Sequence, residues 1–90
     1  MAEIIYTESY LKRARKFIKN HPELISQYEK TLRLLEINPN HPSLRLHKLH
    51  GKFSDLYSVS INISYRISLY FLIETDKIIP VDIGSHDEMY

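Results

Sequence analysis

The chain has 90 residues, including 12 Lys and Arg, 11 Asp and Glu, and neither Cys nor Trp. This length fits one small domain and excludes a cleft between two domains, so residues 1–90 are predicted to form a single domain. With 43% hydrophobic and 26% charged residues, the composition is that of a globular protein. The absence of Cys excludes disulfides, a thiolate nucleophile and Cys-based zinc sites, and it fits a reducing compartment.

Charge and hydropathy limit the cellular compartments and the partners that the sequence allows. No apolar run approaches the about 18–20 residues of a membrane span, so we expect a cytoplasmic protein without a membrane partner. The formal net charge of +1 argues against a protein that binds free nucleic acid by charge alone. Residues 1–55 hold ten Lys and Arg against six Asp and Glu, whereas residues 56–90 hold two against five, which gives net charges of +4 and −3.

The first part of the chain predicts a short strand followed by a hairpin of two amphipathic helices. The strand covers residues 3–6, and the hydroxyl of Thr7 or Ser9 can cap the first helix. This helix should end near Asn20, because Pro22 disfavours helical conformation in the residue before it and suits the first turn of a second helix. The second helix has an apolar stripe at helical spacing, formed by Leu24, Tyr28, Leu32 and Leu35.

From residue 44 the hydrophobic period changes from helical spacing to two, which predicts strands over residues 44–47, 56–61, 65–73 and 78–84. Pro80 in the last strand indicates a sheet edge or a bulge. The alternation assigns one sheet face to the helices, with Tyr57, Val59, Ile61, Tyr65, Ile67, Leu69, Phe71 and Ile73. The opposite face is polar, with Ser58, Ser60, Asn62, Arg66, Ser68 and Tyr70. The predicted fold class is α+β, with both helices on one sheet face.

The polar residues suggest chemistry that needs no metal. His47 and His50 lack a zinc signature, so neither a metal site nor a cofactor is predicted, and His21 and His41 receive no role. Arg66 combines long reach with a fixed charge in the middle of a strand. Two histidines together with this arginine form a set that can cleave RNA, since the 2′-hydroxyl is an internal nucleophile that requires only a base, an acid and a cation.

Four segments resemble the RelE/ParE toxin superfamily when they are taken together in order. They are LHKLHG at 46–51, LYSV at 56–59, SYRISLY at 64–70 and IGSHDEMY at 83–90. The sequence is most similar to the YafQ-like and YoeB-like branch of mRNA interferases, because it has a His before the glycine and another near its end. The resemblance implies a β-α-α-β-β-β fold, with the helical hairpin packed on one face of a small, mainly antiparallel sheet.

The resemblance also implies a function and its residues. The chain would be the toxin of a type II toxin–antitoxin pair, a ribosome-dependent mRNA endonuclease that cleaves by 2′-hydroxyl attack without metal. Arg66 would stabilise the scissile phosphate, His86 would be the general acid, and His47 would be the base or a phosphate and sugar ligand. Tyr90 would hold bases by stacking. The remaining RNA contacts would be Lys48, Lys52 and Ser60. The implied partners are a cognate antitoxin, with which the toxin forms a hetero-oligomer, the ribosome and mRNA.

Several alternatives stay open at this point. Ser58 and Ser60 stand where RelE has lysines, so slow cleavage or loss of activity is one alternative. A ParE-like, non-enzymatic topoisomerase poison is another, and a degenerate member that only binds an antitoxin is a third. Among the individual residues, Arg66 can instead pair with Asp82 or Asp55. The basic face of the first helix can be solvated or face ribosomal RNA.

Overall fold

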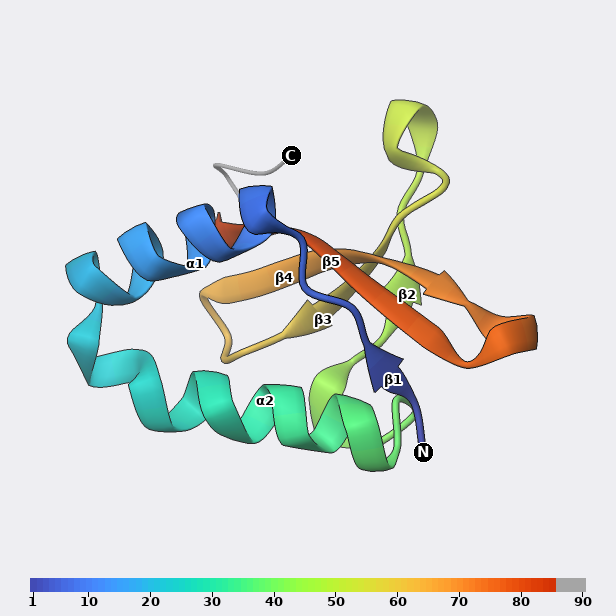
Figure 1. Ribbon diagram of the computed structural model, residues 1–90, viewed down its shortest axis with the longest axis horizontal. Helices are drawn as coiled ribbons and strands as arrows, with labels where there is room; N and C mark the ends of the chain where they lie inside the picture. The colour runs from blue at the N-terminus through green and yellow to red at the C-terminus, as the bar shows by residue number, and fades with distance from the viewer. Residues whose placement is uncertain (86–90) are drawn as a thin grey trace.

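Two helices and a five-stranded mixed sheet make up the part of the chain that the computed structural model describes, residues 1–85. The helices form a pair beside the sheet (Figure 1). The strand order is β1-β5-β4-β3-β2, parallel between β1 and β5 and antiparallel elsewhere. This confirms the predicted α+β class. The elements are β1 Glu3–Ile4, α1 Glu8–Asn20, α2 Ile25–Ile37, β2 His47–Lys48, β3 Tyr57–Ser60, β4 Tyr65–Leu72 and β5 Lys77–Ser85.

Local sequence signals determine the ends of the helices. The Thr7 Oγ1 atom accepts a hydrogen bond from the backbone N–H of Tyr10 at 3.1 Å, so Thr7 rather than Ser9 is the N-cap of α1. The helix ends at Asn20 as predicted. Pro22 begins a 3₁₀ turn, Pro22–Leu24, and α2 therefore starts later than predicted. In this turn the N–H of Leu24 donates to the carbonyl of His21 at 2.9 Å, which tightens the connection.

The predicted alternation of the strands is confirmed in β3 and β4. Val59 pairs with Ile67, and both are fully buried in the core against the helices. Ile73 is an exception, because β4 ends at Leu72 and Ile73 starts a 3₁₀ turn in which it is 66% exposed. The large buried side chains of this core are Tyr10, Phe17, Leu24, Leu35, Leu44, Ile67, Leu69 and Ile78.

Pro80 lies at a β-bulge, one of the two positions that the sequence predicts for it. Ser68 of β4 pairs with Asp82, whereas the next residue, Leu69, pairs with Pro80, which leaves Val81 as an extra residue in β5. The carbonyl of Val81 accepts a hydrogen bond from Arg13 Nη1 of α1 at 3.1 Å. A proline that cannot donate to the ladder is therefore accommodated in an inner strand, and α1 is tied to the bulge.

The segment between α2 and β3 differs from the predicted strand over residues 44–47. Pro42–Leu44 is a 3₁₀ turn, and Arg45 follows in the left-handed conformation with φ 50°, so only His47–Lys48 is extended. Gly51 has φ +69°, a conformation that favours glycine, and it opens the 3₁₀ turn Gly51–Phe53. This turn lies at the end of an arm that projects from the sheet (Figure 1).

A pair of tyrosines joins the two helices. The hydroxyls of Tyr10 and Tyr28 lie 2.9 Å apart, and Tyr10 is fully buried. Burial raises the pKa of Tyr10 far above its usual value, so this residue joins the core as a neutral hydrogen-bonding group. Across residues 1–85, neither helix combines the length and apolar character that crossing a bilayer requires.

Candidate functional site

Polar residues occupy two neighbouring rows across the sheet, on the face opposite the paired core residues Val59 and Ile67. Residues that pair directly across strands share a face, and so do residues two apart along a strand. The first row crosses β2, β3, β4 and β5 with His47, Ser58, Ser68 and Asp82. The second row crosses β3, β4 and β5 with Ser60, Arg66 and Gly84. The register therefore places three of the predicted site residues, His47, Ser60 and Arg66, in adjacent rows.

Arg66 is the charged residue of these rows that has an unsatisfied hydrogen-bond donor. Its side chain is half-buried, and its Nε atom is buried without a hydrogen-bond acceptor. Within residues 1–85 it forms no ion pair, so the expected alternative of pairing with Asp82 or Asp55 is not found. A buried donor without an acceptor costs about 1–3 kcal/mol, and more when the group is charged. The half-buried guanidinium has further N–H groups that an anion with acceptor oxygens can bind.

The serines around Arg66 are buried and provide no charge. Ser58 is fully buried, and its Oγ atom also has no hydrogen-bond partner, while Ser60 and Ser68 are 8% and 4% exposed. In these two rows the one fixed positive charge is that of Arg66. Ser58 and Ser60 stand where lysines would stabilise a bound phosphate. No second fixed cation in the two rows takes the place of those lysines.

His47 is exposed on the edge strand β2, and its ring is oriented by the backbone. The Nδ1 atom lies 2.9 Å from the carbonyl oxygen of Arg45. A carbonyl oxygen only accepts, so this bond requires the proton on Nδ1 and leaves Nε2 as the basic nitrogen of the neutral ring. Arg45, whose carbonyl orients the ring, has a left-handed backbone conformation. The amino-acid sequence does not indicate this conformation.

The separation of His47 and Arg66 suits a group that lies between them. Their strands are two apart, or about 10 Å, and the rows are offset by two residues, or about 7 Å. Both side chains extend from the same face, and the arginine is long. A phosphodiester placed over the buried serines can therefore contact the guanidinium on one side and the imidazole on the other.

A cavity of about 410 Å³ opens beside Ser60 at the end of these rows. Its volume falls in the range of small-molecule sites, which hold a nucleotide-sized group. Ser60 connects the cavity to Arg66, its pairing partner. The walls carry polar groups together with two apolar side chains, and they are formed by Pro42, Ser43, Arg45, Ser60, Asn62 and Ile63.

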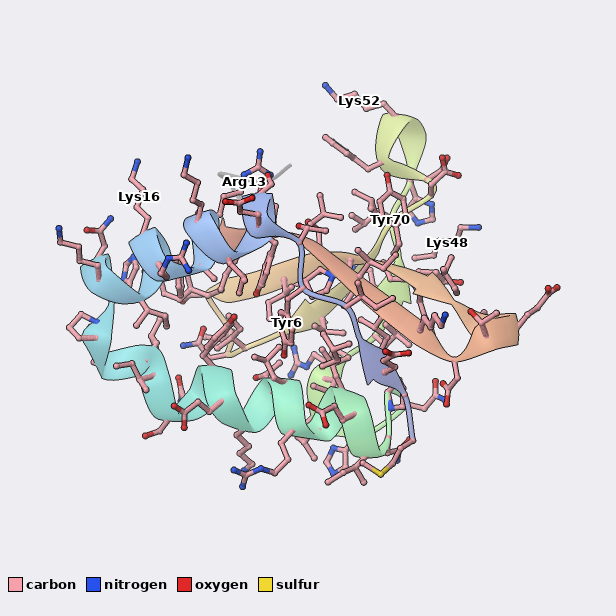
Figure 2. The ribbon with its side chains drawn as sticks, viewed as in Figure 1. Tyr6, Arg13, Lys16, Lys48, Lys52 and Tyr70 are labelled. Atoms are coloured by element: carbon pink, nitrogen blue, oxygen red, sulfur yellow. The ribbon has the colours of Figure 1, made fainter. Side chains whose placement is uncertain are left out.

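Lys48 and Lys52, two further predicted site residues, are not members of these rows. Lys48 pairs with Tyr57, whose ring packs on the core, so Lys48 is on the opposite face of β2 from His47. Lys52 extends from the tip of the arm, with Nζ 5.3 Å from the centre of the Phe53 ring (Figure 2). His86 and Tyr90 lie outside the described residues. Among residues 1–85 no group of three or more His, Asp or Glu side chains converges as a metal site.

Comparison with known proteins relates the fold of this chain to solved structures of toxins. No family model matches the chain, and no curated protein matches it in sequence. Solved structures do match: YafQ from Escherichia coli BL21(DE3) superposes with a TM-score of 0.79 at 12% identity, over 100% of this chain and 99% of that one. This chain has the YafQ toxin fold. A metal-bound toxin from Helicobacter pylori matches with a TM-score of 0.71 at 21% identity, over 100% of both chains.

A third solved structure that matches is a toxin from another bacterium. The YoeB/ParE toxin of Agrobacterium tumefaciens has a TM-score of 0.73 at 12% identity, over 93% of this chain and 98% of that one. YafQ is also known in a complex with DinJ, described as a toxin–antitoxin complex. The RelE-like architecture expected from the four sequence segments is therefore confirmed over the full length of the YafQ toxin fold.

Proposed function

We propose that this protein is the toxin of a type II toxin–antitoxin pair and cleaves mRNA on the ribosome. The observation that carries the proposal is the buried, unpartnered Nε of Arg66, placed one row from His47 on the polar face. An arginine in this state is suited to a phosphate whose negative charge grows during the reaction. The fold shared with YafQ supports the same conclusion.

The residues account for the steps of 2′-hydroxyl attack. His47 Nε2 accepts the proton of the 2′-hydroxyl, and the 2′-oxygen forms a bond to the adjacent phosphorus. Arg66 stabilises the negative charge on the phosphoryl oxygens. The bond from phosphorus to the 5′-oxygen then breaks, and that oxygen takes a proton from His86, which we propose as the acid. The products are a 2′,3′-cyclic phosphate and a 5′-hydroxyl.

The ribosome has a specific role in this proposal. The chain has a net charge of +1. Residues 56–90, which include β3, β4 and β5, have a net charge of −3, and their only Lys and Arg residues are Arg66 and Lys77. Electrostatic attraction of free RNA to this face is therefore weak. A ribosome that holds and orients the mRNA supplies the positioning that the chain lacks, which converts a bimolecular encounter into a local one.

Induced expression tests the proposed function against its alternatives. We expect protein synthesis to stop before any DNA damage is detected, and mRNA fragments to carry a 2′,3′-cyclic phosphate at the cut. A ParE-like topoisomerase poison would produce DNA damage first. A degenerate, antitoxin-binding protein would leave growth and translation unchanged at every expression level. Either of these two results rejects the nuclease proposal.

The antitoxin is proposed to dock in an apolar groove between α1 and α2. The groove has a volume of about 420 Å³ and lies away from the polar rows of the sheet. Leu11 is an exposed apolar side chain in its wall, and Arg15 and Lys19 stand beside it. An amphipathic segment with an apolar stripe and acidic flanks fits this combination. The groove is lined by Leu11, Ala14, Arg15, Ile18, Lys19 and Tyr28.

Leu11→Glu should therefore abolish neutralisation while leaving the toxic activity intact. A carboxylate placed in the apolar groove is desolvated and lies where the acidic partner would approach, so we expect at least a tenfold loss of affinity. The measurement is growth rescue and co-purification with the product of the adjacent reading frame. Ile25→Glu is the matched control, since Ile25 is a similarly exposed apolar residue that lies outside the groove. Normal rescue of the Leu11 variant would contradict this docking site.

A further inference from the structure

A second polar cavity lies between α1 and β5, at a position that the sequence did not indicate. Its volume is about 260 Å³. Helix α1 and its capping residue contribute four polar side chains, and β5 contributes one carboxylate. Arg13 and Lys16 project from the side of α1 that faces away from α2 (Figure 2). The polar lining residues are Arg13, Lys16, Asn20, His21 and Asp82.

The charges in this cavity favour an anion. Arg13 uses Nη1 to bond the carbonyl of Val81, which fixes the guanidinium at the rim and leaves its other N–H groups for a ligand. Lys16 is exposed and, within the described residues, has no acidic partner. The opposing carboxylate of Asp82 accepts the backbone N–H of Ile83 at 2.9 Å, so it is partly satisfied by its own strand. Two fixed cations therefore face a single carboxylate.

Two of the residues that line this cavity, Phe17 and His21, belong to an aromatic cluster. The ring of His21 lies 4.7 Å from the ring of Phe17 and 4.8 Å from that of Tyr65, measured between centroids. His21 is also 3.7 Å from a carboxylate oxygen of Glu23, measured from Nδ1. Sites that bind single-stranded nucleic acid combine cations for the backbone with rings for bases or sugars. Phe17 and His21 supply the rings of this cavity.

Strand β5 contributes both to this cavity and to the rows that hold Arg66. Asp82 is the last member of the first row, and Gly84, two residues further along β5, is the pairing partner of Arg66. Neighbouring strands lie about 5 Å apart, so the β5 wall of the cavity is one strand away from the strand that carries Arg66.

We infer that the cavity between α1 and β5 binds an RNA phosphodiester other than the one held at Arg66. This inference rests on the proposed function and extends it, because it assigns the backbone contact to Lys16 and Arg13 of α1. The phosphodiester can come from the substrate strand or from ribosomal RNA, which present the same chemistry. Asp82 opposes the bound anion and limits the affinity of the site.

The test measures binding apart from cleavage. The probe is a fluorescent single-stranded RNA with 2′-O-methyl groups, which cannot be cut by 2′-hydroxyl attack, and its dissociation constant is measured across a range of salt concentrations. Lys16→Gln should reduce the slope of log affinity against log salt by about 0.7, the value for one lost contact to a single strand. Asp82→Asn should tighten binding, since it removes a negative charge but keeps an acceptor for Ile83.

Lys12→Gln is the matched control, because Lys12 is also an exposed lysine of α1 but does not line the cavity. It should leave the slope unchanged. A second arm measures co-sedimentation of the variants with ribosomes that carry no mRNA. A defect of Lys16→Gln confined to this arm assigns the site to ribosomal RNA, and a defect with the oligonucleotide assigns it to the substrate strand. If Lys16→Gln matches the unmodified protein in both arms, the inference is wrong, whatever the outcome of the cleavage assays.

Discussion

Arg66→Gln is expected to lower the rate of mRNA cleavage on programmed ribosomes by about 10²–10³-fold, the usual cost of removing one electrostatic stabiliser of a transition state. The uncharged amide cannot neutralise the charge that grows on the phosphoryl oxygens. Arg66→Lys restores the charge without the planar set of donors, so it should recover only part of the rate. The measurement is the single-turnover rate of appearance of fragments with a 2′,3′-cyclic phosphate.

Folding should be almost unaffected by the same substitution. The buried Nε of Arg66 has no partner to lose, so we expect the free energy of unfolding to change by no more than about 1 kcal/mol. Arg33→Gln serves as the control, because Arg33 is an exposed arginine of α2 with no place in the polar rows. A fully active, folded Arg66→Gln protein would remove the main support for the proposed nuclease.

His47→Asn is expected to reduce cleavage by about 10²–10⁴-fold, the range for loss of a general base. The shorter amide can still donate to the carbonyl of Arg45, as Nδ1 does, but it places no basic nitrogen at the position of Nε2. The substitution therefore separates the orienting bond from the proton transfer. The rate is measured in the same single-turnover assay.

His50→Asn is the control for this experiment, since His50 is exposed in the same segment but precedes the arm rather than pairing with Ser58. It should retain the rate of the unmodified protein. The double variant of His47 and Arg66 should cleave almost as fast as the slower of the two single variants. The effects of two groups that act in the same step on the rate are not additive. A His47→Asn protein with an unchanged rate would contradict its role as the base.

The spacing of hydrophobic residues along the sequence predicted most of the fold, because buried side chains recur at regular intervals in helices and strands. The caps of α1, the parity of β3 and β4 and the turn after β3 follow from local residue chemistry. At that turn the side-chain oxygen of Asn62 accepts the N–H groups of Ser64 and Tyr65. The alternation also predicted that Ser58, Ser60 and Arg66 share one face, and the strand register confirms it.

Features that depend on tertiary contacts or on an unusual backbone conformation were not predictable in the same way. The left-handed Arg45 breaks a strand that the alternation of Leu44 and Leu46 favoured, and its carbonyl then orients His47. His21 received no role from the sequence, because only the fold brings its ring against Tyr65 and beside β5. The bond from His47 to Arg45 spans two residues, but it requires the left-handed backbone of Arg45, which no residue pattern indicates. The contact of His21 with Tyr65 joins residues far apart in the chain, so no local pattern encodes it.

The parallel pairing of β1 with β5 has a consequence for the order of folding. Glu3 pairs with Lys77, so almost the whole chain must be available before β1 can join the sheet, and closing so long a loop is entropically slow. By contrast, β3, β4 and β5 are consecutive and connected by short turns. The strand that carries Arg66 is therefore expected to acquire both of its neighbours early, and the docking of the N-terminal strand completes the sheet last.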